Sequence, residues 1–216
     1  MLGLCKDTVA AWSHRLQICV MNAEDSRQVP LGGANVEVEC DETETGRRQK
    51  GVHGHKKVVK GDIWGVVERR SGRVILEIYD KLKVQEHVER RFGPPRADEL
   101  EDLCQTCIKC GTVLMTDGAR AYEVISKKLG YHHDYVDHSS GVYSKKAKVA
   151  GQRRSVHTNT IDRLWGRLHC WWNHRGEVLE HQHLEVRKEF QWRQNLGTKD
   201  PFMNLVDAVK KSYFPA

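Results

Sequence analysis

The chain has 216 residues, of which 39% are hydrophobic and 30% charged, and these proportions are typical of a folded globular protein. No run of about 18 apolar residues occurs, so no transmembrane helix is expected, and the start, MLGLCKDTVAAW, lacks the apolar core of a signal peptide. Seven cysteines without a repeating spacing favour a reducing, intracellular compartment over a disulfide scaffold. The net charge of +6, with 12 histidines besides, favours a polyanionic partner.

The first 28 residues are predicted to be helical. The stretch GLCKDTVAAWSHRL is typical of the turn and second helix of a helix-turn-helix, in which Gly3 forms the turn and Lys6, Thr8 and Ser13 face DNA. An ordinary amphipathic helix would explain the same apolar face. Residues 29–35, VPLGGAN, have the composition of a linker.

Three strands are predicted after this linker. The stretch ANVEVECDET alternates apolar and polar residues, as a half-buried strand does, and the strand is expected to end at Asp41. The segment TGRRQKGVHGHKKVVKG is rich in basic residues and glycine, so we expect a hairpin or solvated excursion, which either contacts phosphates or only faces water. The strands DIWGVVERR and RVILEIYD are joined by Ser71-Gly72, which is a hairpin signal.

Residues 81–110 are predicted to be helical and contain a C-x-x-C-x-x-C pattern formed by Cys104, Cys107 and Cys110. A structural zinc site would need a second pair of ligands, and the nearest candidates are the adjacent histidines at 132–133. Because a predicted strand and helix separate these histidines from the cysteines, we favour small apolar cysteines on a buried helix face.

Strands and helices alternate in the second half of the chain. The stretch VLMTDGARAY is predicted to be a short buried strand followed by Asp117, and a helix then runs to Gly130. The stretch YHHDYVDH is another strand, and the basic segment SSGVYSKKAKVAGQRRS is predicted to be a loop. Two C-terminal helices are expected over residues 176–195 and 201–214.

Residues 157–172 are predicted to start as a polar loop and to continue as a helix. Apolar residues at positions 161, 164, 165 and 168 have the spacing of one buried helix face. Thr158 or Thr160 is expected to cap the first turn. Asn159 and Asp162 are three residues apart and therefore lie one above the other. A carboxylate at this place needs a partner that neutralises it.

This order, with three consecutive strands followed by alternating helices and strands, fits an α/β protein with a mixed sheet flanked by helices. It is the order of the ribonuclease H-like fold. Asp41 and Asp117 each follow a predicted strand, and Asp162 lies on the late helix. Three such carboxylates are what a two-metal phosphoryl-transfer site needs, and their oxygen atoms suit Mg²⁺ or Mn²⁺ better than zinc.

Several blocks of the sequence resemble a known family. The stretches VEVECDET, GDIWGVVERRSGRVILEI, VLMTDGARAY, VDHSSGVY and VHTNTIDRLWGRL occur in the order seen in Merlin-type DDE transposases. These are eukaryotic relatives of bacterial insertion-sequence transposases with the ISXO-two-like domain. The resemblance implies a catalytic domain over residues 35–175, a partial helix-turn-helix over 1–30 and a C-terminal helical extension over 176–216.

The resemblance also implies the roles of individual residues. Asp41, Asp117 and Asp162 correspond to the metal-binding catalytic residues of the family, and Asn159 is the alternative third ligand. Asp is one methylene shorter than Glu, so a ligand oxygen at position 162 retreats by roughly 1.5 Å. The family usually has Glu, a basic residue and an aromatic residue at the following positions of this chain: Asp162, His169 and Ala119.

The function implied by the resemblance is metal-dependent cleavage and transfer of double-stranded DNA at transposon ends, with Mg²⁺ or Mn²⁺ as cofactor. A homodimer is compatible with this function, and the expected location is the nucleus in a eukaryote and the cytoplasm otherwise. Two other functions stay open: a transposase-derived DNA-binding protein without catalysis, and a nuclease of the same fold. The basic residues expected to contact DNA, for which a purely solvated loop is the alternative, are Lys6, Lys145, Lys146, Lys148, Arg153, Arg154 and His157.

Overall fold

The computed structural model describes residues 3, 5–50, 56–78, 97–175 and 182–214, with the backbone alone for 46–50 and 56–62. The chain forms two compact units. We call residues 29–180 the sheet unit, and residues 1–28 together with 181–216 the helical unit.

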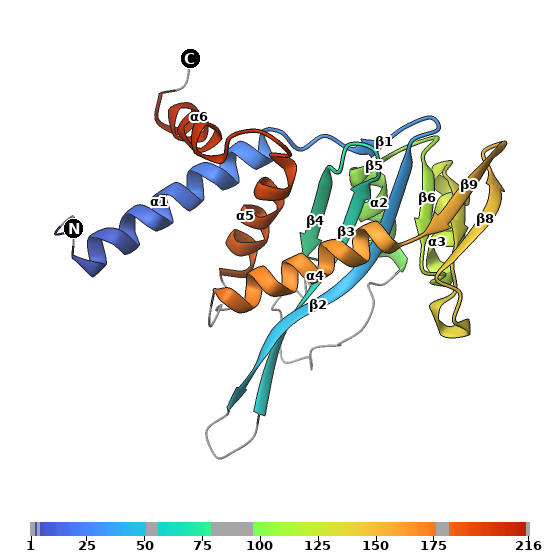
Figure 1. The fold of residues 1–216 in the computed structure, drawn as a ribbon, viewed down its shortest axis with the longest axis horizontal. Helices are drawn as coiled ribbons and strands as arrows, with labels where there is room; N and C mark the ends of the chain where they lie inside the picture. Colours follow the sequence, from blue (N-terminus) through green and yellow to red (C-terminus); the bar gives the residue numbers. More distant parts are fainter. Residues whose placement is uncertain (1–2, 4, 51–55, 79–96, 176–181, 215–216) are drawn as a thin grey trace. The chain divides into compact units, whose positions relative to one another are not determined.

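A five-stranded mixed sheet is the centre of the sheet unit (Figure 1). In spatial order its strands are β4 (Val74–Ile78), β3 (Lys56–Glu68), β2 (Glu37–Lys50), β6 (Val113–Thr116) and β7 (His132–Tyr135). Strands β2, β3 and β4 are antiparallel neighbours, whereas β6 runs parallel to β2 and β7 runs parallel to β6. These are the strand order and directions of the ribonuclease H-like fold, so the predicted fold class is confirmed.

Two helices, α2 (Ala97–Cys107) and α3 (Arg120–Leu129), cover one face of this sheet. Their apolar side chains pack on the residues of β2, β3, β4 and β6 that point to that face. Cys104 and Cys107 are buried in this core, whereas Cys110 is exposed. The cysteines of α2 therefore pack as small apolar residues, as expected. The part of the predicted helix from 81 to 96 lies outside the described residues.

The opposite face is covered by helix α4 (Asn159–His174) and by the hairpin of β8 (Ser144–Val149) and β9 (Gln152–His157). The apolar face of α4 that the sequence predicted is buried, and it consists of Ile161, Leu164, Trp165, Leu168 and Trp172. The prediction of a basic loop over residues 139–155 is wrong for most of that stretch. One side of the hairpin instead buries Val149 and Val156 against β6.

Two further predictions about strands need correction. Strand β2 does not end at Asp41, because it continues to Lys50 and pairs with β3 over this whole length. The predicted linker at 29–35 contains β1 (Leu31–Gly32), which pairs in parallel with β5 (Ile108–Lys109).

The helical unit consists of α1 (Lys6–Asp25), α5 (His183–Asn195) and α6 (Pro201–Tyr213). Helix α1 packs against both others, with Cys19 and Ala23 against Ala208 and with Val20 against Trp192 and Leu196. It is one continuous helix, and a helix-turn-helix is not seen in the described residues. None of the described helices is both long and apolar enough to cross a membrane.

Candidate active site

Asp41, within β2, and Asp117, directly after β6, both lie just beyond the point at which these two neighbouring parallel strands stop pairing. The pairing of β2 with β6 ends where Glu39 lies opposite Met115, so Asp41 and Asp117 follow two residues later on each strand. Because side chains alternate between the faces of a sheet, Asp41 points to the same face as Glu39, which is the face that α4 covers. The register of β2 and β6 thus brings these two carboxylates close together, where the pairing of the two strands ends.

Burial raises the pKa of Asp41 to about 6; a hydrogen bond from Trp165 opposes this rise, and the charges of Asp117 and Asp162 add to it. The pKa of Asp162 is also raised. Partial removal of its carboxylate from water, with the charges of Glu39 and Asp117, outweighs a hydrogen bond from Thr158 and the nearby His138. The three predicted carboxylates are therefore close enough for their charges to interact.

This arrangement suits a divalent cation. Atom Oδ1 of Asp117 is buried and has no hydrogen-bond partner among the described residues. A buried oxygen of this kind costs free energy unless a donor or cation satisfies it. Among the described side chains, no group of three or more His, Cys, Asp or Glu residues is arranged so that it could hold a metal ion. The carboxylates are therefore electrostatic neighbours, and the atoms that they offer are oxygens, the ligand type of hard divalent cations.

Trp165 fixes one oxygen of Asp41. Its indole Nε1 donates a hydrogen bond of 2.8 Å to Oδ2 of Asp41. The residue opposite Asp41 on β3 is Gly65, and a Cβ atom there would lie 2.3 Å from Cη2 of Trp165. The missing side chain at position 65 thus makes room for the indole ring.

Helix α4 is capped by a residue from β2. Both the Thr160 and Ile161 amides donate to Oε2 of Glu39, at 2.7 and 2.9 Å, and the Thr160 hydroxyl donates to Oε1. Glu39 is fully buried and is also paired with Arg69 at 2.6 Å. The expected capping by Thr158 or Thr160 is wrong, because no side-chain cap comes from Thr158 and the carboxylate of Glu39 takes this role.

Helix α4 lies along β2 (Figure 1), and the contacts between the two elements recur at regular intervals. Glu39 contacts the amide of Ile161, Asp41 contacts Trp165, and Thr43 Oγ1 lies 3.1 Å from Nε2 of His169. Four helical residues advance about 6.0 Å, and two strand residues advance about 6.6–6.8 Å. Contacts therefore repeat along both elements, and they place Asp162 on the turn before Trp165. Asn159 is half-buried at the first position of α4.

A fourth carboxylate, that of Glu42, belongs to a buried network on the other face of β2. The hydroxyl of Tyr122 donates to Oε1 of Glu42 at 2.5 Å and accepts from Trp64 Nε1 at 3.0 Å. Burial raises the pKa of Glu42 to about 7; the Tyr122 hydrogen bond opposes this rise, and the charges of Asp41 and Asp117 add to it. Glu42 could not be identified from the sequence, because its position directly after Asp41 does not reveal the contacts with Tyr122 and Trp64.

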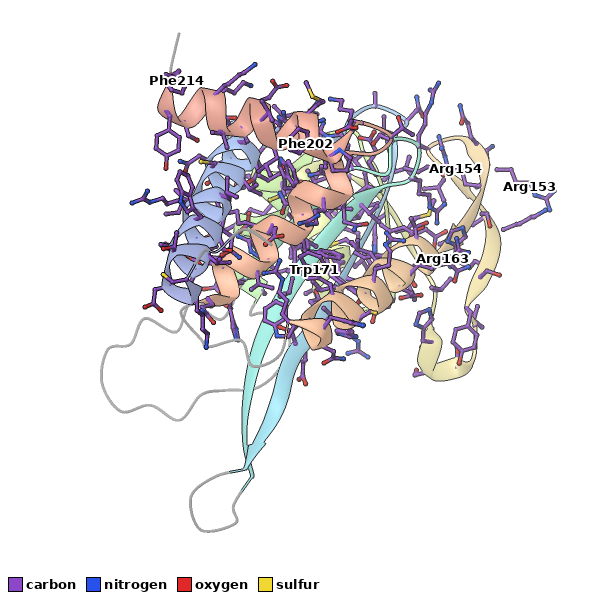
Figure 2. All side chains as sticks on the ribbon, turned by 60° about the vertical axis from the view of Figure 1, so that its left-hand side comes forward. Arg153, Arg154, Arg163, Trp171, Phe202 and Phe214 are labelled. Atoms are coloured by element: carbon purple, nitrogen blue, oxygen red, sulfur yellow. The ribbon has the colours of Figure 1, made fainter. Side chains whose placement is uncertain are left out.

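The predicted DNA-contacting arginines of β9 have different environments. Arg153 is exposed and Figure 2 shows it pointing away from the hairpin, whereas Arg154 is buried. The Arg154 guanidinium donates to Glu37 at 2.8 Å, and hydrogen bonds from Arg154 and Arg69 lower the pKa of Glu37 although burial acts in the opposite direction. We therefore assign Arg154 a structural role.

Some of the other predicted basic residues are exposed, and others are held in ion pairs or hydrogen bonds within the protein. Lys146 and Lys148 are exposed, and Lys148 pairs across the hairpin with Arg153, so these three side chains share its outer face. Lys145 is paired with Asp134 at 2.7 Å. His157 lies 3.0 Å from Arg69 Nη2 and 3.2 Å from Glu39, inside the network that caps α4. Lys6 is exposed on α1, in the helical unit.

The family described as "ISXO2-like transposase domain" matches residues 25–195, which is most of the chain. No curated protein matches. One solved structure, the catalytic core domain of BIV integrase, is similar at 15% sequence identity with a TM-score of 0.35, and the match covers 84% of this chain and 99% of the integrase chain.

Proposed function

We infer, because the chain belongs to the ISXO2-like transposase family, that it cuts and joins DNA strands in a reaction that depends on divalent metal ions. The observation that carries this proposal is the mutual effect of charge among Asp41, Asp117 and Asp162, which come from β2, the end of β6 and the first turn of α4. Asp41 and Asp117 are half-buried and Asp162 is exposed. Like charges this close repel one another, and the half-buried ones are costly unless they have a cationic partner. The family membership and this cluster support the same chemistry.

Asp41, Asp117 and Asp162 would hold the ions through their carboxylate oxygens. When bound, two Mg²⁺ or Mn²⁺ ions activate an attacking water or 3′-hydroxyl and stabilise the leaving oxygen. Trp165 holds Oδ2 of Asp41 and so restricts the orientation of the carboxylate that would bind a cation. The unpartnered Oδ1 of Asp117 provides a second oxygen. Thr158 orients Asp162 through a hydrogen bond of 3.3 Å.

The substrate in this proposal is double-stranded DNA at transposon ends. The exposed basic side chains on the outer face of the hairpin would contact its backbone phosphates: Lys146, Lys148 and Arg153. These contacts would position DNA without reading its sequence.

The experiment measures cleavage of a duplex that carries the transposon ends, in Mg²⁺ and in Mn²⁺. Asp41→Asn and Asp117→Asn are expected to abolish cleavage, while the control Asp207→Asn, at an exposed position of the helical unit, should cut like the parent. If the parent cuts nothing in either metal, this proposal is wrong, and a DNA-binding protein without catalysis becomes the better interpretation.

The same assay decides the third ligand. A carboxylate contributes a full negative charge to two divalent ions, whereas an amide oxygen is neutral. Asp162→Ala should therefore abolish cleavage, and Asn159→Ala should weaken it less. Asp162→Glu should preserve or raise the rate, because it restores the longer side chain usual in the family. If Asp162→Ala cuts normally while Asn159→Ala is inactive, the asparagine is the ligand.

A further inference from the structure

The loop that follows β7 is held in one conformation by its own hydrogen bonds. The carboxylate of Asp137 accepts from the amides of Ser139 and Ser140, at 3.0 and 3.3 Å, and from the Ser139 hydroxyl at 2.6 Å. The Val142 amide donates to the carbonyl of Asp137 at 3.1 Å. Side chains carried by this loop therefore have a defined position before any ligand binds.

Two aromatic rings of this loop lie against each other, and one of them faces solvent. The centroids of the His138 and Tyr143 rings are 5.1 Å apart, with 36° between the ring planes. Tyr143 is 62% exposed, and the neighbouring Val142 is 40% exposed. The fold therefore holds an aromatic face in water instead of burying it.

This aromatic pair lies next to the third carboxylate of the candidate active site. Nε2 of His138 is 3.3 Å from the Thr158 hydroxyl, and that hydroxyl donates to Oδ2 of Asp162 at 3.3 Å. Tyr143 directly precedes Ser144, which pairs with His157 at the end of the hairpin nearest α4. One hydroxyl group thus connects the aromatic pair to Asp162.

We propose that His138 and Tyr143 form a stacking platform for one unstacked nucleobase of the DNA strand that is cut. Every nucleobase has a π-face, so an exposed aromatic side chain beside a basic surface binds bases with little regard to sequence. The basic surface here is the outer face of the hairpin that begins at Ser144, with Lys146, Lys148 and Arg153. This inference rests on the proposed function, because it places the base beside the carboxylates that would cut the strand.

The platform requires a base that has left its neighbours in the duplex. A base inside an intact double helix presents its edges to the grooves, while its faces are covered by the bases above and below. The protein is therefore expected to bind an unpaired extension next to the cleavage position more tightly than the same extension without bases. Backbone contacts would contribute equally to both.

The test compares two probes in chelator, so that no cleavage occurs: a duplex with a short thymidine extension, and the same duplex with abasic sites in the extension. The parent should bind the thymidine probe about 5- to 150-fold more tightly than the abasic probe. Tyr143→Ala should remove this difference and leave the salt dependence unchanged. Tyr143→Phe should keep the difference, because the ring is retained, and so should the control Tyr213→Ala, at a 54% exposed tyrosine of the helical unit.

A second measurement locates the base. An extension that carries 5-iodouracil should photo-crosslink to the peptide containing Tyr143. If Tyr143→Ala still distinguishes the two probes as the parent does, or if the cross-link maps elsewhere, the platform is refuted while the proposed function stands. If the parent binds neither duplex, both the platform and the proposed function are refuted.

Discussion

The indole ring of Trp165 occupies the space that a side chain at position 65 would fill. A Cβ atom on Gly65 would lie 2.3 Å from Trp165 Cη2 and 2.9 Å from Leu76 Cδ2. Since both neighbours belong to the closely packed interior, neither can move away at low cost. Gly65, Trp165 and the hydrogen bond to Asp41 therefore form one unit.

Gly65→Ala should lower the free energy of unfolding by about 1–3 kcal/mol, because it overpacks this site. Gly166→Ala is the matched control, since no heavy atom lies within 4 Å of its Cβ position. That control should stabilise α4 by about 0.5–1 kcal/mol, because alanine favours a helix more than glycine does. Urea denaturation of both variants measures the two effects, and equal stability of the variants would contradict the close contact.

Trp165→Phe retains most of the ring but loses the donor to Asp41. The expected result is a loss of about 10- to 100-fold in affinity for Mg²⁺, which is the usual effect of removing a partner that orients a ligand. Trp172→Phe changes another buried tryptophan of α4 and should leave Mg²⁺ affinity unchanged. Calorimetric titration of the metal-free proteins measures both affinities. Equal losses in the two variants would mean that the effect is one of packing.

Glu39→Gln removes a buried charge that caps α4 and pairs with Arg69. Arg69 would lose its 2.6 Å ion pair with Glu39 but keep the one with Glu37 at 3.2 Å, so the free energy of unfolding should fall by about 1.5–3 kcal/mol, the usual contribution of a hydrogen bond to a charged group. The control is Glu123→Gln, which breaks an exposed pair with Lys127 and should leave the stability close to that of the parent. Thermal unfolding followed by circular dichroism separates these outcomes, and similar melting temperatures would refute the capping role.

Stability without metal should depend on pH through Asp41 and Glu42. Folding raises their pKa values from 3.8 and 4.5 to about 6 and about 7, so the folded state binds more protons than the unfolded state in this range. Their contribution to stability is therefore complete below about pH 4 and is lost as the pH rises through about 7.

The matched variant is Asp41→Asn combined with Glu42→Gln. Burial lowers the pKa of His133 and His157, which acts in the opposite sense, so the difference between variant and parent is the informative quantity. The variant should gain stability relative to the parent between about pH 4 and about pH 7 in chelator. A difference that does not change with pH would show that these carboxyl groups are not perturbed.

Arg153→Ala and Arg154→Ala should have different effects although the residues are adjacent. Arg153→Ala should reduce the slope of log affinity for DNA against log salt by about 0.9, while stability stays within about 0.5 kcal/mol of the parent. Arg154→Ala removes the hydrogen bond to Glu37 and should lower the free energy of unfolding by about 1.5–3 kcal/mol. Salt titrations of DNA binding and urea denaturation distinguish the two roles, and the reverse assignment would contradict the observed burial.

Local patterns in the sequence were sufficient to locate the strand and the helix that carry two of the candidate carboxylates. Asp117 follows a strand of four buried residues, and Asp162 lies beside a helix face with clear apolar spacing. Residue type and spacing carry this information within short stretches. The late helix and the positions of these carboxylates next to their elements could therefore be predicted.

The remaining parts of the site depend on contacts between distant residues. Glu39 and Thr160 are 121 positions apart, and Arg154 and Glu37 are 117 apart, so neither pair is visible in a local pattern. The hairpin of β8 and β9 was predicted to be a loop because its exposed side is lysine-rich, and few apolar residues mark its buried side. For the same reason, Arg153 and Arg154 could not be distinguished before their burial was known.

The similar spacing of contacts along α4 and β2 also affects how uniquely the protein folds. If the helix slid by one turn, each helical residue would meet a strand residue of the same orientation two places along, so spacing alone does not select the correct alignment. The amides that Glu39 accepts from exist only at the first turn of a helix, where they lack partners within it. The carboxylate of Glu39 thus favours the one alignment of α4 on β2 in which the first turn of the helix lies beside it. Without it, the chain would be expected to populate several alignments of α4, each with Asp162 at a different distance from Asp41.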